Sequence, residues 1–130
     1  MPVYLNHTIV HAHDKAASAA FVSEILGVGE PRPFGPFLVV DVDNGVSLDF
    51  IDAGPDWEIQ PQHYAFLVSD DEFDAIFGRI QERGLTYWAD PHRGQPGEIN
   101  HHFGGRGVYW ADPADNLLEI ITTPYGSEAP

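Results

Sequence analysis

Cysteine is absent from the 130 residues of this chain. The absence excludes disulfides, thiolate metal sites and a cysteine nucleophile. Any metal site must therefore be built from histidine and carboxylate side chains, of which the chain has seven histidines and 20 Asp and Glu residues.

Basic residues are also scarce. The chain has only six Lys and Arg residues against 20 Asp and Glu residues, which gives a formal charge of −14. The six basic residues form no cluster in the sequence. Long-range attraction to nucleic acid or to an anionic membrane is disfavoured, so we expect neither as a partner.

Long apolar runs are missing as well. No stretch approaches the roughly 20 residues that cross a bilayer, and the start "MPVYLNHTIV" has no basic segment followed by an apolar one. We therefore expect a cytoplasmic protein. The 43% hydrophobic content suffices for one core of ordinary size, which favours a single domain over residues 1–130.

The first half of the chain predicts a strand, a helix and a hairpin. "VYLNHTIV" is rich in β-branched and aromatic residues, and a helix follows between Asp14 as N-cap and Gly27 as stop signal. Two strands, at residues 37–42 and 46–52, are joined at Asn44-Gly45, a strong hairpin signal.

The second half repeats this order after a Pro-rich linker at about residues 54–62. "HYAFLVSD" predicts a strand, and the helix after it has a capping box at Ser69 and Glu72. Its apolar face comprises Phe73, Ile76, Phe77 and Ile80. "TYWAD", "GVYWAD" and "LLEIIT" are predicted strands, with a long loop between the first two.

The spacing of matching residues indicates a duplication. His7 lies seven residues before Asp14, and His63 lies seven before Asp70. We therefore expect an α+β protein of two modules, at about residues 3–53 and 63–124.

Two carboxylates occupy matching places near the module ends. Aligning "VSLDFID" with "NLLEIIT" places Asp49 at the position of Glu119. A carboxylate in an apolar strand is costly to bury unless it is paired or coordinated. Side-by-side modules would bring His7, His63 and these carboxylates around one concavity, as donors suited to Zn, Fe, Mn, Ni or Co.

The chain resembles the vicinal oxygen chelate superfamily, which includes glyoxalase I, bleomycin and fosfomycin resistance proteins and extradiol dioxygenases. The resemblance extends from "LNHTIVHAHD" through "HYAFLVSD" to "GGRGVYWADPADNLLEIIT". It implies two βαβββ modules forming a cup-shaped mixed sheet. It also implies one divalent metal ion per chain, held by His7, His63 and Glu119.

Two positions depart from the family pattern. Ala114-Asp115 replaces the usual Asp-Gly of the turn, so Asp115 or another turn type must supply a position that often has positive φ. Asp49 stands where four-ligand members have Glu. Because Asp is one methylene shorter, the coordination number is left open.

Further side chains are candidates for binding and catalysis. His11 would line the cup beyond His7, one of the neighbours Tyr109 and Trp110 should face the cup, and Arg106 could bind an anionic group. His101 or His102 could act as acid or base. The catalytic candidates are Glu119, His101 and Tyr109, and the substrate-binding candidates are His11, Arg106 and Trp110.

The expected activity is that of a metal-dependent lyase, isomerase or extradiol-type dioxygenase. Two neighbouring oxygens of a small substrate would bind the metal, which stabilises an enolate, oxyanion or catecholate. The alternative is a metal-free protein of the bleomycin-resistance type that sequesters a drug or metabolite. The fold often dimerises, so we expect a homodimer.

Overall fold

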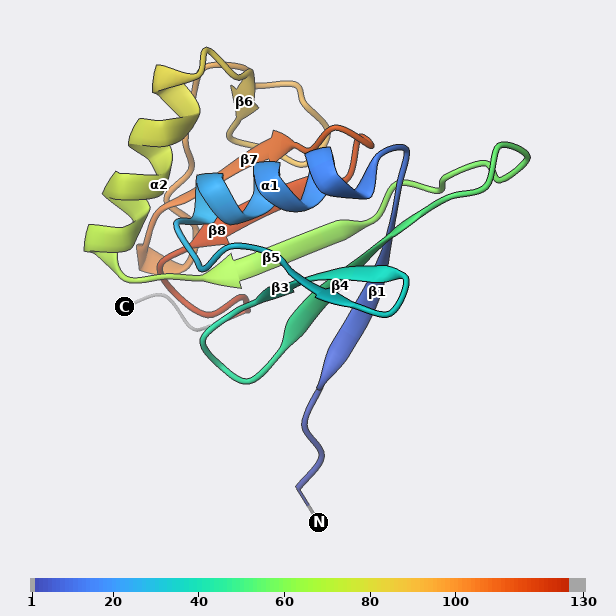
Figure 1. Cartoon of the computed structure of the whole chain (residues 1–130). Coiled ribbons are helices and arrows are strands. Elements are labelled where there is room, and N and C mark those ends of the chain that lie inside the picture. Colours follow the sequence, from blue (N-terminus) through green and yellow to red (C-terminus); the bar gives the residue numbers. More distant parts are fainter. Residues whose placement is uncertain (1, 127–130) are drawn as a thin grey trace. The chain divides into compact units, whose positions relative to one another are not determined.

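The computed structural model describes residues 2–126 and contains two α-helices and two four-stranded sheets (Figure 1). The chain divides into two compact units, the first ending at Gln60 and the second beginning at Pro61. No helix in the described part of the chain has both the length and the apolarity to span a membrane.

The first unit has the order βαβββ. Its elements are β1 (His7–Ala12), α1 (Lys15–Leu26), β2 (Arg32–Phe34), β3 (Phe37–Asp41) and β4 (Ser47–Asp52). The strands are ordered β1-β4-β3-β2, and β1 is parallel to β4. Helix α1 contacts β1, β3 and β4.

The predicted helix ends of the first unit are confirmed. The Asp14 carboxylate accepts hydrogen bonds from the backbone N–H groups of Ala16 and Ala17, and Gly27 ends the helix with φ 71°. The hairpin at Asn44-Gly45 is also present, with Gly45 at φ 78°.

The second unit repeats the βαβββ order. Its elements are β5 (His63–Leu67), α2 (Asp70–Glu82), β6 (Tyr87–Trp88), a short 3-10 helix η1 (His102–Gly104), β7 (Gly107–Ala111) and β8 (Leu117–Ile121). The strands are ordered β5-β8-β7-β6, with β5 parallel to β8. Ser69 caps α2, which buries Phe73, Ile76 and Ile80 as its periodicity predicts. The two βαβββ modules are those of the glyoxalase/dioxygenase fold.

Strand β2 was not predicted. It has three residues, all exposed, lies at the edge of its sheet and contains Pro33. Proline lowers strand propensity but is tolerated at an edge, where no partner needs its missing N–H. The first strand also begins later than expected, at His7, after an exposed segment that includes Val3 and Tyr4.

Candidate functional site

The second sheet carries three predicted site residues on one face. Glu119 on β8 lies directly opposite Tyr109 on β7 and Ala65 on β5. Residues directly opposite across a sheet point to the same side, as do residues two apart on a strand. His63, two residues before Ala65, therefore shares this face with Glu119 and Tyr109.

His63 and Glu119 are in direct contact. The distance from His63 Nε2 to Glu119 Oε1 is 3.1 Å, and the Glu119 side chain is 8% exposed against 46% for His63. The other ring nitrogen, His63 Nδ1, lies 2.9 Å from the carbonyl oxygen of Leu117. A carbonyl oxygen only accepts, so Nδ1 carries the hydrogen of this bond.

This arrangement needs a hydrogen atom or a cation between the two groups. A neutral imidazole that donates from Nδ1 presents a lone pair at Nε2, which a carboxylate oxygen repels. The contact is favourable only with a proton on Nε2 or with a cation that both groups bind. Two neighbouring ligands of one ion, each about 2.1 Å from it, lie about 3.0 Å apart in octahedral and about 3.4 Å apart in tetrahedral coordination. The pair thus fits two positions of a metal site, and a carbonyl oxygen that accepts from the far ring nitrogen is typical of metal-binding histidines.

Tyr109 completes this group. It is 7% exposed, its ring centroid lies 5.9 Å from that of His63, and its hydroxyl hydrogen bonds with Glu119. Burial and then the neighbouring Glu119 charge raise the pKa of the Tyr109 hydroxyl. The hydroxyl is therefore protonated near neutral pH and donates to the carboxylate.

The first sheet has the same register. His7 pairs with Ser47 and Ile9 with Asp49, as His63 pairs with Leu117 and Ala65 with Glu119. Asp49 therefore occupies the place in its sheet that Glu119 has in the other. The Ser47 hydroxyl donates to Asp49 Oδ1 at 2.7 Å, and His7 Nδ1 lies 2.7 Å from Asn6 Oδ1.

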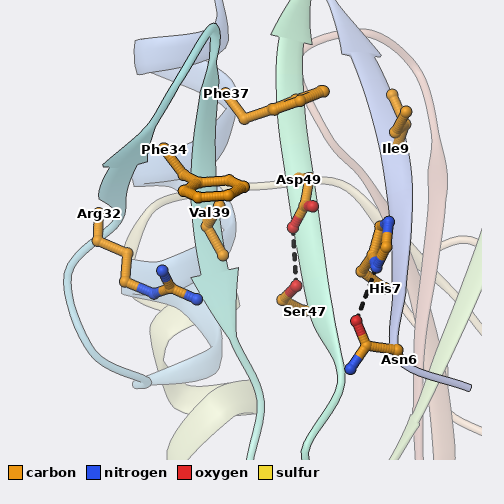
Figure 2. Close-up of a pocket in the computed structure, with 9 residues that line it drawn as sticks. All are labelled: Asn6, His7, Ile9, Arg32, Phe34, Phe37, Val39, Ser47 and Asp49. Carbon is orange, nitrogen blue, oxygen red and sulfur yellow. Dashed lines mark hydrogen bonds between the residues drawn. The ribbon is translucent and has the colours of Figure 1, made fainter.

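A pocket of about 270 Å³ opens on this face of the first sheet (Figure 2). His7, Asp49 and Ser47 line it together with the aromatic side chains of Phe34 and Phe37. Sequence reasoning identified His7 and Asp49 here. It missed Ser47, although the two-residue period of a strand places Ser47 beside Asp49, and it missed Phe34 with the unpredicted strand β2.

Two predicted substrate-binding residues, Trp110 and Arg106, have surroundings that the sequence did not predict. Trp110 is fully buried on the strand face opposite Tyr109, with no exposed surface for a substrate, and its indole N–H has no partner among the described residues. The Arg106 guanidinium binds Asp70 at 3.0 Å and Asp74 at 2.8 Å, and it lies 4.4 Å from the centre of the Phe73 ring. Two carboxylates of α2 thus pair with Arg106 and join the start of β7 to that helix. Binding of an anionic group by Arg106 stays a prediction.

The remaining candidates lie elsewhere. His11 shares a face of β1 with His7 and stacks on Trp57 at 5.2 Å between ring centroids. His101 is exposed in the loop before η1. Within residues 2–126 no three His, Asp or Glu side chains are arranged to hold a metal ion. His7 as a third ligand therefore stays a prediction.

Comparison with known proteins identifies the family. Residues 4–120 match the Glyoxalase/Bleomycin resistance protein/Dioxygenase superfamily. The solved structure named oxidase ChaP-H1 is 63% identical, with 97% of this chain and 100% of that chain covered and a TM-score of 0.93. Oxidase ChaP-H2 is 61% identical, with 98% of each chain covered and a TM-score of 0.93.

A more distant relative carries the name of a transferase. Glutathione transferase FosA from Serratia marcescens is 27% identical over 121 residues, which cover 89% of this chain and 78% of FosA. These three relatives bear the names of enzymes. This chain belongs to the Glyoxalase/Bleomycin resistance protein/Dioxygenase superfamily.

Proposed function

We propose that the protein is a divalent-metal-dependent oxidative enzyme acting on a small substrate with two neighbouring oxygens. The observation that carries the proposal is the contact between His63 Nε2 and Glu119 Oε1, which needs a cation or a proton. His63 and Glu119 would hold the ion, with His7 as the third ligand.

His7 and His63 each have an oxygen atom next to Nδ1. His7 Nδ1 faces the Asn6 side-chain oxygen, as His63 Nδ1 faces the Leu117 carbonyl oxygen. An oxygen acceptor at Nδ1 favours the tautomer whose Nε2 lone pair is free to bind a metal. Both histidines would therefore ligate through Nε2.

The ligand set and the names of the relatives favour iron(II) and molecular oxygen as the reagents. Two histidines and one carboxylate with open positions form the ligand set of many non-haem iron oxygenases, and the relatives with 61–63% identity are named oxidases. When bound, the ion would supply Lewis acidity and a redox centre to the substrate oxygens.

A catechol is the simplest substrate that meets these requirements. In ring cleavage, catechol and O₂ combine, one C–C bond beside the hydroxyl-bearing carbons breaks, and both oxygen atoms enter the product. No further oxidant or reductant is needed. Tyr109 would remain neutral and hold the Glu119 carboxylate in place, while Glu119 or His101 would accept a substrate proton.

Oxygen uptake tests this proposal. The iron(II)-reconstituted protein should consume one O₂ per molecule of product with at least one member of a panel of catechols, and Glu119→Gln should abolish uptake. An iron-loaded wild type that takes up no oxygen with any catechol would contradict the proposed reaction.

We also propose that the protein acts as a homodimer. Among the described residues, β1 and β5 each lie at one end of their sheet, and edge strands readily pair with another chain. Apolar side chains on these edges are exposed, Ile9 at 45% and Leu67 at 61%. Sedimentation equilibrium should give the mass of two chains, and a strictly monomeric mass would contradict this expectation.

A further inference from the structure

A buried polar pair occupies the turn between β7 and β8 in the second unit. Asn116 is 2% exposed and Asp112 is 7% exposed. The Asn116 side chain donates through Nδ2 to Asp112 Oδ2 at 3.0 Å. Asp112 Oδ1 accepts from the backbone N–H groups of Ala114 at 3.0 Å and Asn116 at 2.8 Å. Both oxygens of this buried carboxylate therefore have donors, which offsets the cost of burying a charge.

The oxygen of the Asn116 amide extends from this turn to the start of β5. Oδ1 accepts from the backbone N–H of Gln62 at 2.7 Å. Because the Asp112 carboxylate only accepts and a backbone N–H only donates, these two partners determine which end of the amide carries the oxygen. Gln62 directly precedes His63. The polar pair thus links the β7–β8 turn to the backbone before a predicted metal ligand.

Gln62 is held through both of its backbone groups. Its N–H is bound by Asn116, and its carbonyl oxygen accepts from the Leu117 N–H at 2.8 Å. The Leu117 carbonyl oxygen in turn lies 2.9 Å from His63 Nδ1. Residues 116–117 therefore fix the chain before His63 and also supply the acceptor that places the ring hydrogen on Nδ1.

The first unit has the backbone bond but not the side-chain contact. The strand registers place Val46 at the position that Asn116 has in the second unit. The Ser47 N–H still donates to the Asn6 carbonyl oxygen at 3.0 Å. A valine side chain accepts no hydrogen bond, and His7 Nδ1 faces the Asn6 side chain instead of a strand carbonyl. A βαβββ unit thus forms without this contact, so the contact is free to serve the site.

We propose that Asp112 and Asn116 are positioning residues for the metal ligand His63. Asp112 orients the Asn116 amide, and this amide holds the backbone before His63. The ring then meets the Leu117 carbonyl oxygen with Nδ1 and Glu119 with Nε2. The proposal rests on the proposed function in one respect, that His63 binds the ion.

Calorimetric titration of the full-length protein with zinc(II) tests the proposal. Asn116→Val gives the second unit the residue of the first and should weaken zinc binding by about 10–100-fold, the usual effect of losing a group that orients a metal ligand. The matched control is Asn100→Ala, which removes another buried asparagine of this unit, bonded to the Ala89 carbonyl oxygen. This control should retain zinc affinity. An equal loss of affinity in both variants would overturn the proposal.

An exchange of the two side chains separates orientation from packing. In Asp112→Asn alone, the new amide nitrogen would face the Asn116 Nδ2, so that donor meets donor. In Asn116→Asp alone, two carboxylates would meet in a buried turn. The double variant Asp112→Asn/Asn116→Asp keeps the net charge and restores every contact, with the bond between the two side chains reversed. It should recover most of the zinc affinity that each single variant loses, and a double variant as weak as the single ones would overturn the proposal.

The metal-free protein gives a readout that does not depend on the proposed function. In EDTA-treated wild type, hydrogen exchange should show a protected Gln62 amide. Long-range ¹H–¹⁵N NMR spectra, at a pH that leaves the ring neutral, should place the His63 ring hydrogen on Nδ1. Asn116→Val should lose both signatures, and the exchanged pair should restore them. If Asn116→Val does not fold, Asp112→Asn takes its place, and unchanged signatures in the folded variant would overturn the proposal.

The two proposals fail in different ways. A wild type that shows both NMR signatures, loses them in Asn116→Val and binds no zinc would refute the proposed function, while the positioning of the His63 ring would stand. Zinc affinity that is unchanged in a folded Asn116→Val would refute the positioning role alone.

Discussion

At the scale of single residues, the site depends on hydrogen bonds that fix the histidine rings. The recurrence of His7 and His63 was readable from their equal spacing to Asp14 and Asp70. The atoms that orient them were not, because the Leu117 carbonyl reaches His63 only through the pairing of β5 with β8. The sequence alone therefore predicted the candidate metal ligands, but not which ring nitrogen of each histidine has a lone pair available for a metal.

The contacts of Trp110 and Arg106 also depend on residues that are distant in the sequence. Alternation along β7 required one of Tyr109 and Trp110 to face the site, but the choice between them depends on the register with β8. Arg106 is held by Asp70 and Asp74. These acids are on α2, 36 and 32 residues away in the sequence, so no local pattern revealed the contact.

The raised pKa of Tyr109 gives a pH-dependent prediction. Folding favours its protonated form, so its contribution to stability is complete below the ordinary tyrosine pKa of about 10 and is lost as pH rises through the raised folded value. The free energy of unfolding in urea, measured on EDTA-treated protein between about pH 8 and pH 11, should therefore fall less steeply in Tyr109→Phe than in wild type. Tyr4→Phe, at an exposed position, is the matched control. If the free energy of unfolding fell equally steeply with pH in wild type and in Tyr109→Phe, the proposed effect of burial and of Glu119 on the Tyr109 hydroxyl would be contradicted.

At the scale of secondary structure elements, local signals were sufficient wherever a cap or a turn defined the boundary. Ser69 caps α2 as predicted, its side chain accepting from the Glu72 backbone N–H at 3.1 Å. Asp115 supplies the positive φ of the turn before β8, at 67°. Strand β2 lacked such a signal, because it is short and contains proline, and only its pairing with β3 defines it.

A pair of glycine substitutions tests the packing of β7. A Cβ at Gly107 would lie 2.8 Å from Asn100 Oδ1, whereas a Cβ at Gly78 in α2 would meet nothing within 4 Å. Gly107→Ala should destabilise the protein by about 1–3 kcal/mol through overpacking. Gly78→Ala should stabilise it by about 0.5–1 kcal/mol through helix propensity. Urea unfolding measures both, and a Gly107→Ala protein as stable as Gly78→Ala would contradict the described contact.

At the scale of the whole molecule, the duplication accounts for the arrangement of the polar residues. The two sheets have the same strand order and register, which places Asp49 and Glu119 in equivalent positions as the sequence alignment predicted. The modules have since diverged in their chemistry. Glu119 contacts His63 and Tyr109, whereas Asp49 binds Ser47 and faces a pocket with phenyl rings.

Metal analysis of the purified, reconstituted protein tests whether His63 and Glu119 share a metal ion. We predict about one divalent ion per chain in wild type and in the control His13→Ala, which changes an exposed histidine of the same chain. We predict loss of the ion in His63→Ala and in Glu119→Gln. A wild type that binds no metal, or full metal content in both site variants, would contradict the account and favour the metal-free binding protein instead.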